Sequence, residues 1–174
     1  MNMAYPATLK TYANGQVGAF FADVPEAITA GTSEAEALEA AQDALTVALS
    51  GYLDDARPLP APSKAGYGQF LVALPPRAAI KLAIHQAMRD EGMTQAQLAM
   101  RLGIDERQVR RILDLGHESR LSQLEAALAA TGLHATISVS KVSPMSPRRA
   151  EPSSGSAAGI GALSHLVDMA LNRG

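Results

Sequence analysis

Cysteine and tryptophan are absent from this chain of 174 residues, and only four tyrosines and three phenylalanines supply aromatic rings. Without cysteine there is no disulfide framework, no thiol nucleophile and no cysteine-ligated zinc or iron–sulfur site. No apolar run has the length needed to cross a bilayer. The N-terminal stretch, residues 1–6, lacks the basic start and apolar core of a secretory signal. We therefore expect a soluble, cytoplasmic protein.

Sequence signatures of catalysis and metal binding are also missing. The chain contains no Gly-x-Ser-x-Gly elbow, no glycine-rich phosphate-binding loop and no dinucleotide fingerprint. Its histidines are scattered, without ligand spacing and without acidic partners at fixed offsets. We therefore expect no metal site, no cofactor and no enzymatic activity. The four histidines are His85, His117, His134 and His165.

Charged and aromatic residues are divided unevenly along the chain. Residues 1–64 hold three basic and eight acidic residues, a net charge of −5, whereas residues 65–143 hold nine basic and seven acidic residues, a net charge of +2. All aromatic residues lie within the first 70 positions. This division indicates two modules of different chemistry, one acidic with aromatic residues and one mildly basic without them.

The acidic module is predicted to be a small sheet with one helix. Strands are expected over residues 6–12, 17–21, 27–30 and 67–74, and Asn14-Gly15 is typical of a tight hairpin turn. Ser33 and Glu36 form a capping box, after which apolar residues recur every three or four positions as far as Tyr52. The order β-β-β-α-β predicts an α+β domain with the helix on one face of the sheet.

Acidic residues lie on the solvent side of this predicted helix. These acids either form a simple hydrated surface or complement a basic, RNA-binding partner. They are Glu34, Glu39 and Asp43. A metal-dependent nuclease needs several carboxylates converging on metal ions, but the first predicted strand holds no acid. We therefore do not expect catalysis in this module.

The basic module contains two N-caps, a small residue and a glycine at fixed spacing. Thr94 and Asp105 are the predicted caps, Ala99 stands where two helices cross closely, and Gly103 supplies a left-handed turn. This pattern predicts a helix-turn-helix over residues 94–113. It resembles the phage-repressor (Cro/C1) type.

The second helix of this motif is expected to lie in the major groove of DNA. Its apolar residues Val109 and Ile112 face inward, so the polar residues face outward. Arginines there are candidates for guanine, a glutamine for adenine, and the first residue of the preceding helix for a phosphate. The predicted DNA-binding residues are Gln95, Glu106, Arg107, Gln108, Arg110 and Arg111, with simple solvation as the alternative for each. A charge of +2 is weak for one copy, so we expect a dimer.

Four short motifs in the acidic module resemble the HicB family of antitoxins. They are Tyr5-Pro6-Ala7, the run 18–25, the helix start 31–37 and the proline-rich segment 58–63. The resemblance implies a partial RNase H-like fold that binds and blocks a HicA-type toxin, an RNA-cleaving protein. It also implies, in one subgroup, a C-terminal helix-turn-helix domain. The predicted toxin-binding residues are Phe20, Phe21, Asp23 and Glu26, with a place in the core as the alternative for the two phenylalanines.

The predicted domains follow from these boundaries. Residues 1–64 form the core of a toxin-binding domain, 65–74 its last strand, and 75–143 an all-α DNA-binding and dimerisation domain with a terminal strand at 134–140. That strand pairs either with the same strand of a second chain or with its own sheet. Residues 144–174 read as a flexible linker with apolar spacing that fits a short helix.

The leading hypothesis is an antitoxin that neutralises a HicA-like toxin and represses its own operon. The alternative is a stand-alone transcriptional regulator whose N-terminal domain senses a small molecule. A third class, an RNA-cleaving enzyme, predicts metal-dependent activity of the purified chain.

Overall fold

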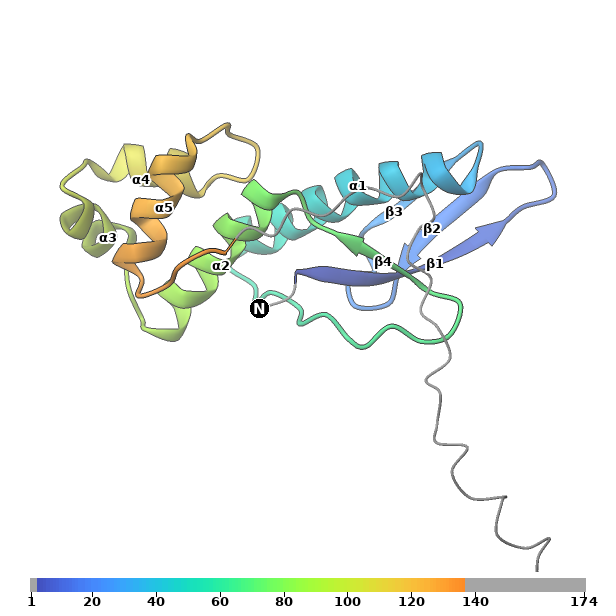
Figure 1. Ribbon diagram of the computed structural model, residues 1–174, viewed down its shortest axis with the longest axis horizontal. Coiled ribbons are helices and arrows are strands. Elements are labelled where there is room, and N and C mark those ends of the chain that lie inside the picture. The colour runs from blue at the N-terminus through green and yellow to red at the C-terminus, as the bar shows by residue number, and fades with distance from the viewer. Residues whose placement is uncertain (1–2, 137–174) are drawn as a thin grey trace, which may run out of the picture.

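The computed structural model describes residues 3–136, and it contains an N-terminal sheet followed by helices (Figure 1). The strands are β1 (Ala4–Thr11), β2 (Val17–Phe21), β3 (Ile28–Gly31) and β4 (Phe70–Ala73). The helices are α1 (Glu34–Asp54), α2 (Pro76–Asp90), α3 (Gln95–Leu102), α4 (Glu106–Leu113) and α5 (Leu121–Ala130). The predicted order β-β-β-α-β is confirmed. No helix of the described part is both long enough and apolar enough to span a membrane.

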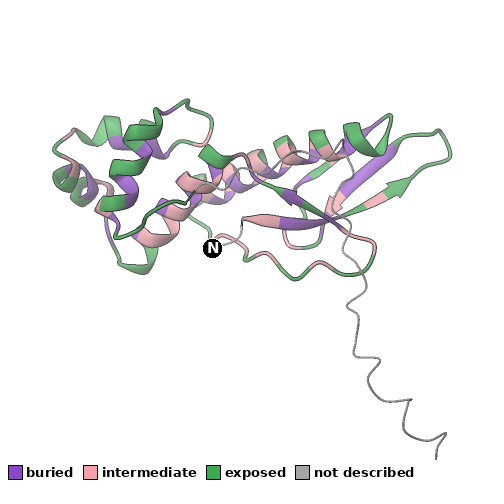
Figure 2. Cartoon of the chain, viewed as in Figure 1, coloured by how far each residue is buried: buried purple, intermediate pink, exposed green. Residues whose placement is uncertain are grey.

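The sheet is antiparallel throughout, in the order β3-β2-β1-β4. Ala7 of β1 pairs with Phe21 on one side and with Phe70 on the other. Because successive side chains of a strand point to opposite faces, alternate residues of β1 and β2 enter the core beneath α1. The buried face of α1 consists of Ala37, Ala41, Leu45, Leu49 and Tyr52, and Figure 2 shows this burial along the helix.

Asn14-Gly15 lies in the turn between the antiparallel strands β1 and β2, as predicted, and Gly15 has φ +82°. Two other local predictions need correction. The last strand begins at Phe70, because the preceding residues form a turn in which Tyr67 is 76% exposed. The Ser33 hydroxyl accepts from the Glu36 N–H, but the Glu36 carboxylate accepts from Thr32 rather than from Ser33.

Helix α2 links the sheet to the remaining helices. It begins at Pro76, whose missing N–H costs nothing in the first turn of a helix. Leu82 of α2 is fully buried in the cluster beneath the sheet, whereas Ile84 and Met88 belong to a second cluster formed with α3, α4 and α5. One helix therefore contributes to both hydrophobic cores.

The caps predicted for α3 and α4 are confirmed. The Thr94 hydroxyl accepts from the Gln97 N–H and the Gln97 side chain accepts from the Thr94 N–H, a complete capping box. Asp105 accepts from the Gln108 N–H at 2.8 Å. Gly103 ends α3 with φ +66°, a conformation that favours glycine.

Two predictions fall at the edge of the described residues or beyond it. Residues 134–136 form no strand, and the rest of the strand predicted over 134–140 lies outside the described residues. The predicted linker and helix of 144–174 lie outside them as well.

Candidate interaction surfaces

The two phenylalanines predicted to contact a partner lie on opposite faces of the sheet. Phe21 is 3% exposed and belongs to the core, so its ring is not available at the surface. The core alternative is correct for this residue. Phe20, half-buried, lies on the other face, where its cross-strand neighbours are Thr8 and Ile28.

An apolar group surrounds Phe20 on that face. Ile28 is 61% exposed and Tyr12 is 41% exposed. A Cβ atom on Gly18 would come within 2.9 Å of both the Tyr12 and the Phe20 rings, so glycine lets these rings close over the strand. Sequence reasoning missed Tyr12, which directly follows β1, and Ile28, which pairs with Phe20 across β2 and β3.

The two predicted acidic contacts are engaged within the chain. Asp23 accepts hydrogen bonds from the Ser63 N–H at 2.9 Å and from its hydroxyl at 3.0 Å. Glu26 accepts from the Tyr52 hydroxyl at 2.8 Å and pairs with Arg57 at 3.0 Å. Its own backbone amide and the Tyr52 hydroxyl lower the pKa of the Glu26 carboxyl. These acids fix the chain around the β2–β3 connection.

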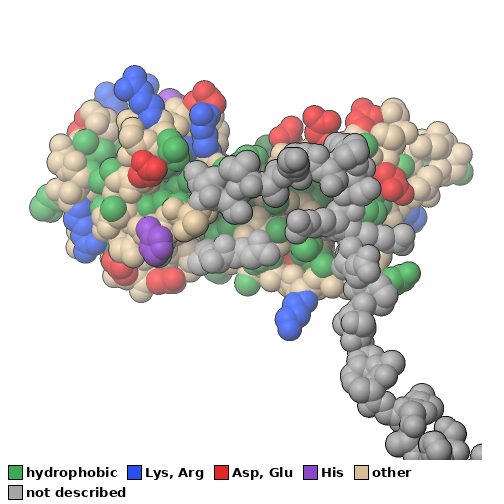
Figure 3. Space-filling model, viewed as in Figure 1, with side chains coloured by type: hydrophobic (Ala, Val, Ile, Leu, Met, Phe, Trp, Pro, Cys, Tyr) green, Lys and Arg blue, Asp and Glu red, His purple; other side chains and the backbone are tan. Residues whose placement is uncertain are grey.

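The acidic residues of α1 are placed differently. Glu34, Glu39 and Asp43 are exposed, as predicted. Within residues 3–136 none of the three forms an ion pair. Figure 3 shows acidic side chains along α1, whereas basic side chains gather beside α4. The helix therefore presents negative charge to the surroundings of the molecule.

Helix α4 exposes its polar residues and buries its apolar ones. Val109 and Ile112 are 0% and 5% exposed and pack into the second cluster. The residues on the outward side are exposed, and none of them forms an ion pair within the described range: Glu106, Arg107, Gln108, Arg110 and Arg111. Five of the six residues predicted to contact DNA are thus exposed on α4.

The sixth predicted residue, Gln95, is the first residue of α3. It lines two adjacent hollows, of about 250 Å³ and about 440 Å³, between the end of α1 and the helices that follow. Arg110 of α4 and Asp54 of α1 line the larger hollow together with Gln95. The N-terminal module therefore stands close to one side of α4.

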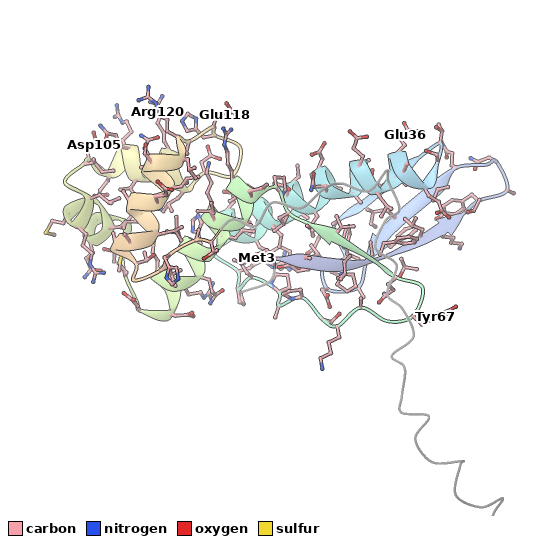
Figure 4. The ribbon with its side chains drawn as sticks, viewed as in Figure 1. Met3, Glu36, Tyr67, Asp105, Glu118 and Arg120 are labelled. Atoms are coloured by element: carbon pink, nitrogen blue, oxygen red, sulfur yellow. The ribbon has the colours of Figure 1, made fainter. Side chains whose placement is uncertain are left out.

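A further basic residue stands near the end of α4. Arg120 is exposed and lines a hollow of about 450 Å³ together with Gln108 and Arg111. In Figure 4, Asp105 marks the start of α4, and Glu118 and Arg120 mark the connection to α5. Sequence reasoning missed Arg120, because it belongs to a loop outside the helix-turn-helix pattern.

Comparison with known proteins decides the family. Residues 4–83 match the family described as a HicB-like antitoxin of a bacterial toxin–antitoxin system. Antitoxin HicB 1 of Photorhabdus laumondii is 37% identical over 138 residues, 79% of this chain and 88% of its own length. The chain belongs to the HicB antitoxin family. Antitoxin HicB of Escherichia coli is 34% identical over 75% of this chain and 94% of its own length. Antitoxin HicB of Pseudomonas fluorescens is 36% identical over 72% of this chain and 86% of its own length.

Membership of the HicB family gives the chain an antitoxin role and implies a toxin as its partner. The family match spans the sheet, α1 and the first half of α2. The alignments with HicB relatives extend over 127 to 138 residues, more than the family match alone.

Proposed function

We propose that this HicB-family chain neutralises a HicA-like, RNA-cleaving toxin through its N-terminal domain and represses its own operon through α3 and α4. Neutralisation is steric and electrostatic, and the chain catalyses no reaction. The site of action is the cytoplasm, where both mRNA and the operon are found. We assign the N-terminal domain a partial RNase H-like fold.

Family membership and surface chemistry support the toxin-binding half. A protein that binds RNA carries positive charge, and exposed acids on α1 complement it. The apolar group of Tyr12, Phe20 and Ile28 supplies a second kind of contact, because aromatic and aliphatic side chains dominate the binding energy of protein interfaces.

One observation carries the DNA-binding half. Helix α4 is joined to α3 by a tight turn, buries Val109 and Ile112, and leaves three arginines exposed and unpaired within residues 3–136. We assign Arg107 and Arg111 to guanine edges and Gln108 to adenine. A homodimer places two such helices on half-sites about 34 Å apart. Arg120 adds a phosphate contact beside them.

The DNA-binding assignment is tested by a double variant, Arg107→Ala with Arg111→Ala. We expect a gel shift on the chain's own promoter to disappear, while capture of the partner in a pull-down persists. Retained promoter affinity would show that α4 does not read the DNA. Loss of both activities would show that the variant damages the fold rather than one surface.

The toxin-binding assignment predicts a short reading frame for a basic protein beside this gene, and it is tested with the protein that this neighbour encodes. We expect the two proteins to co-purify, and we expect co-expression to restore growth that the neighbour alone suppresses. A neighbour that neither binds this chain nor inhibits growth would contradict the assignment.

A further inference from the structure

Two side chains of α2 reach the C-terminal end of α4. The Lys81 ammonium donates to the carbonyl oxygen of Asp114 at 2.6 Å and to that of His117. The His85 Nε2 lies 3.1 Å from the carbonyl oxygen of Leu113, so this nitrogen carries a proton and donates it. Lys81 and His85 are four positions apart and therefore lie on the same face of α2.

The His85 contact meets a physical requirement of the helix end, whereas Lys81 holds Asp114, which caps α4, and His117 in the loop that follows. The last carbonyl groups of a helix have no partner within the helix, and they carry the negative end of its dipole. Lys81 is 1% exposed, and burial lowers the pKa of its ammonium. A buried ammonium is costly unless hydrogen bonds compensate it, so its position relative to these carbonyl groups is closely restricted.

The position of α2 is itself fixed from both sides. Leu82, the neighbour of Lys81, is fully buried in the sheet core, and Ile84 is fully buried in the helical core. Neither Lys81 nor His85 belongs to the outward surface of α4. They touch α4 and the loop after it from the inner side.

We propose that Lys81, assisted by His85, is a positioning residue that sets the direction of α4 in the major groove without touching DNA. The inference depends on the proposed binding of DNA by α4. Bidentate contacts to base edges demand a narrow range of helix orientations, whereas contacts to phosphates tolerate small rotations. Loss of Lys81 therefore weakens specific binding selectively.

The test uses the full chain, its own promoter fragment and a scrambled fragment of equal length. The variant Lys81→Met keeps the apolar stem and removes the ammonium. The control Lys64→Met removes the same charge from an exposed loop between α1 and β4. We expect Lys81→Met to raise the Kd for the promoter about tenfold, because the end of α4 loses the two charge-assisted hydrogen bonds that hold it in place. The Kd for scrambled DNA and the salt dependence of binding stay those of the wild type, and Lys64→Met leaves the promoter Kd unchanged.

Three results would overturn the proposal. In the first, Lys81→Met binds the promoter as tightly as the wild type does. In the second, the substitution raises the Kd for the promoter and the Kd for scrambled DNA by the same factor. In the third, the slope of log K against log salt falls by about one, which identifies a phosphate contact instead. Failure of the proposed function gives a different result: the wild-type chain then binds the promoter fragment and the scrambled fragment with the same Kd.

A second variant covers loss of folding. If thermal unfolding shows that Lys81→Met is not folded at the assay temperature, the variant His85→Phe takes its place in the same DNA-binding measurements. It keeps a planar ring of similar size and removes the hydrogen bond to Leu113. We expect the same selective loss of promoter binding, and wild-type promoter affinity of a folded His85→Phe would refute the positioning role.

Discussion

At the scale of single residues, the crossing of α3 and α4 depends on the size of Ala99. Ala99 is 5% exposed and packs in the cluster that contains Val109 and Ile112. Overpacking of such a site forces neighbouring side chains or the backbone to move. The small residue is therefore a requirement of the turn, and its surface neighbour Ala96 is not under this constraint.

The matched pair Ala99→Leu and Ala96→Leu tests this difference. We expect Ala99→Leu to lower the free energy of unfolding by about 1–3 kcal/mol, because the added side chain has no space. Ala96→Leu, exposed on the same helix, should change it by less than about 0.5 kcal/mol. Urea unfolding at constant pH measures both values. Equal effects of the two variants would contradict a close crossing at Ala99.

His85 links stability to pH. Burial lowers the pKa of His85 below its ordinary value of 6.5, and Asp54 and Lys81 are the charged groups that act on it most. Arg110 and Asp114 line the same hollow. As pH falls below 6.5, the unfolded chain binds a proton that the folded chain resists, so stability decreases in that range.

We expect the free energy of unfolding to decrease between about pH 7.5 and about pH 5.5, and we expect His85→Phe to lessen this decrease. The control His134→Gln, which changes an exposed histidine, should keep the wild-type pH profile. Urea unfolding at several pH values provides the comparison. A His85→Phe profile that is parallel to the wild type would contradict the assignment of this pH dependence to His85.

At the scale of elements, two glycines show that a change from glycine to alanine has opposite effects on stability inside a helix and at its end. Gly51 lies inside α1, whereas Gly103 ends α3 with φ +66°. A Cβ atom would meet nothing within 4 Å at either position. Only backbone conformation therefore distinguishes the two sites.

We expect Gly51→Ala to stabilise the protein by about 0.5–1 kcal/mol, because alanine loses less entropy in a helix. Gly103→Ala should destabilise it by about 1–2 kcal/mol, the cost of the left-handed conformation. Thermal unfolding of the two variants gives the signs directly. Stabilisation by Gly103→Ala would refute the left-handed end of α3.

Elements with strong local signals were predictable, and elements shaped by distant contacts were not. The caps at Thr94 and Asp105 and the glycine at 103 depend on neighbouring residues, so the sequence alone locates them. The start of β4 depends on pairing with β1, which alternation around Tyr67 does not reveal. The same applies to Lys81, whose ammonium meets carbonyl groups of Asp114 and His117, far along the chain.

At the scale of the whole molecule, opposite charges are kept on different modules. Exposed acids lie along α1, and exposed arginines lie on α4, with α2 packed into both cores (Figure 3). This separation suits a protein that meets a basic partner on one module and DNA on the other. It also means that each surface can be altered without changing the other.

The charge-reversal pair Asp43→Lys and Glu125→Lys tests this separation. Both residues are exposed, on α1 and α5 respectively, so both variants change the net charge equally. We expect Asp43→Lys to slow association with the partner about threefold at low salt, since a like charge replaces an attractive one. Glu125→Lys should leave that rate unchanged. Equal rates for both variants, measured by stopped flow, would show that α1 does not face the partner.

The central claim is that this chain blocks an RNA-cleaving toxin by binding it. The most direct measurement is cleavage of an RNA by the protein encoded beside this gene, with increasing amounts of the purified full-length chain. Neutralisation by binding predicts that cleavage stops when the two proteins reach a fixed molar ratio, and that it returns when the chain is removed by proteolysis. Cleavage that continues undiminished in an excess of the folded chain would contradict the account.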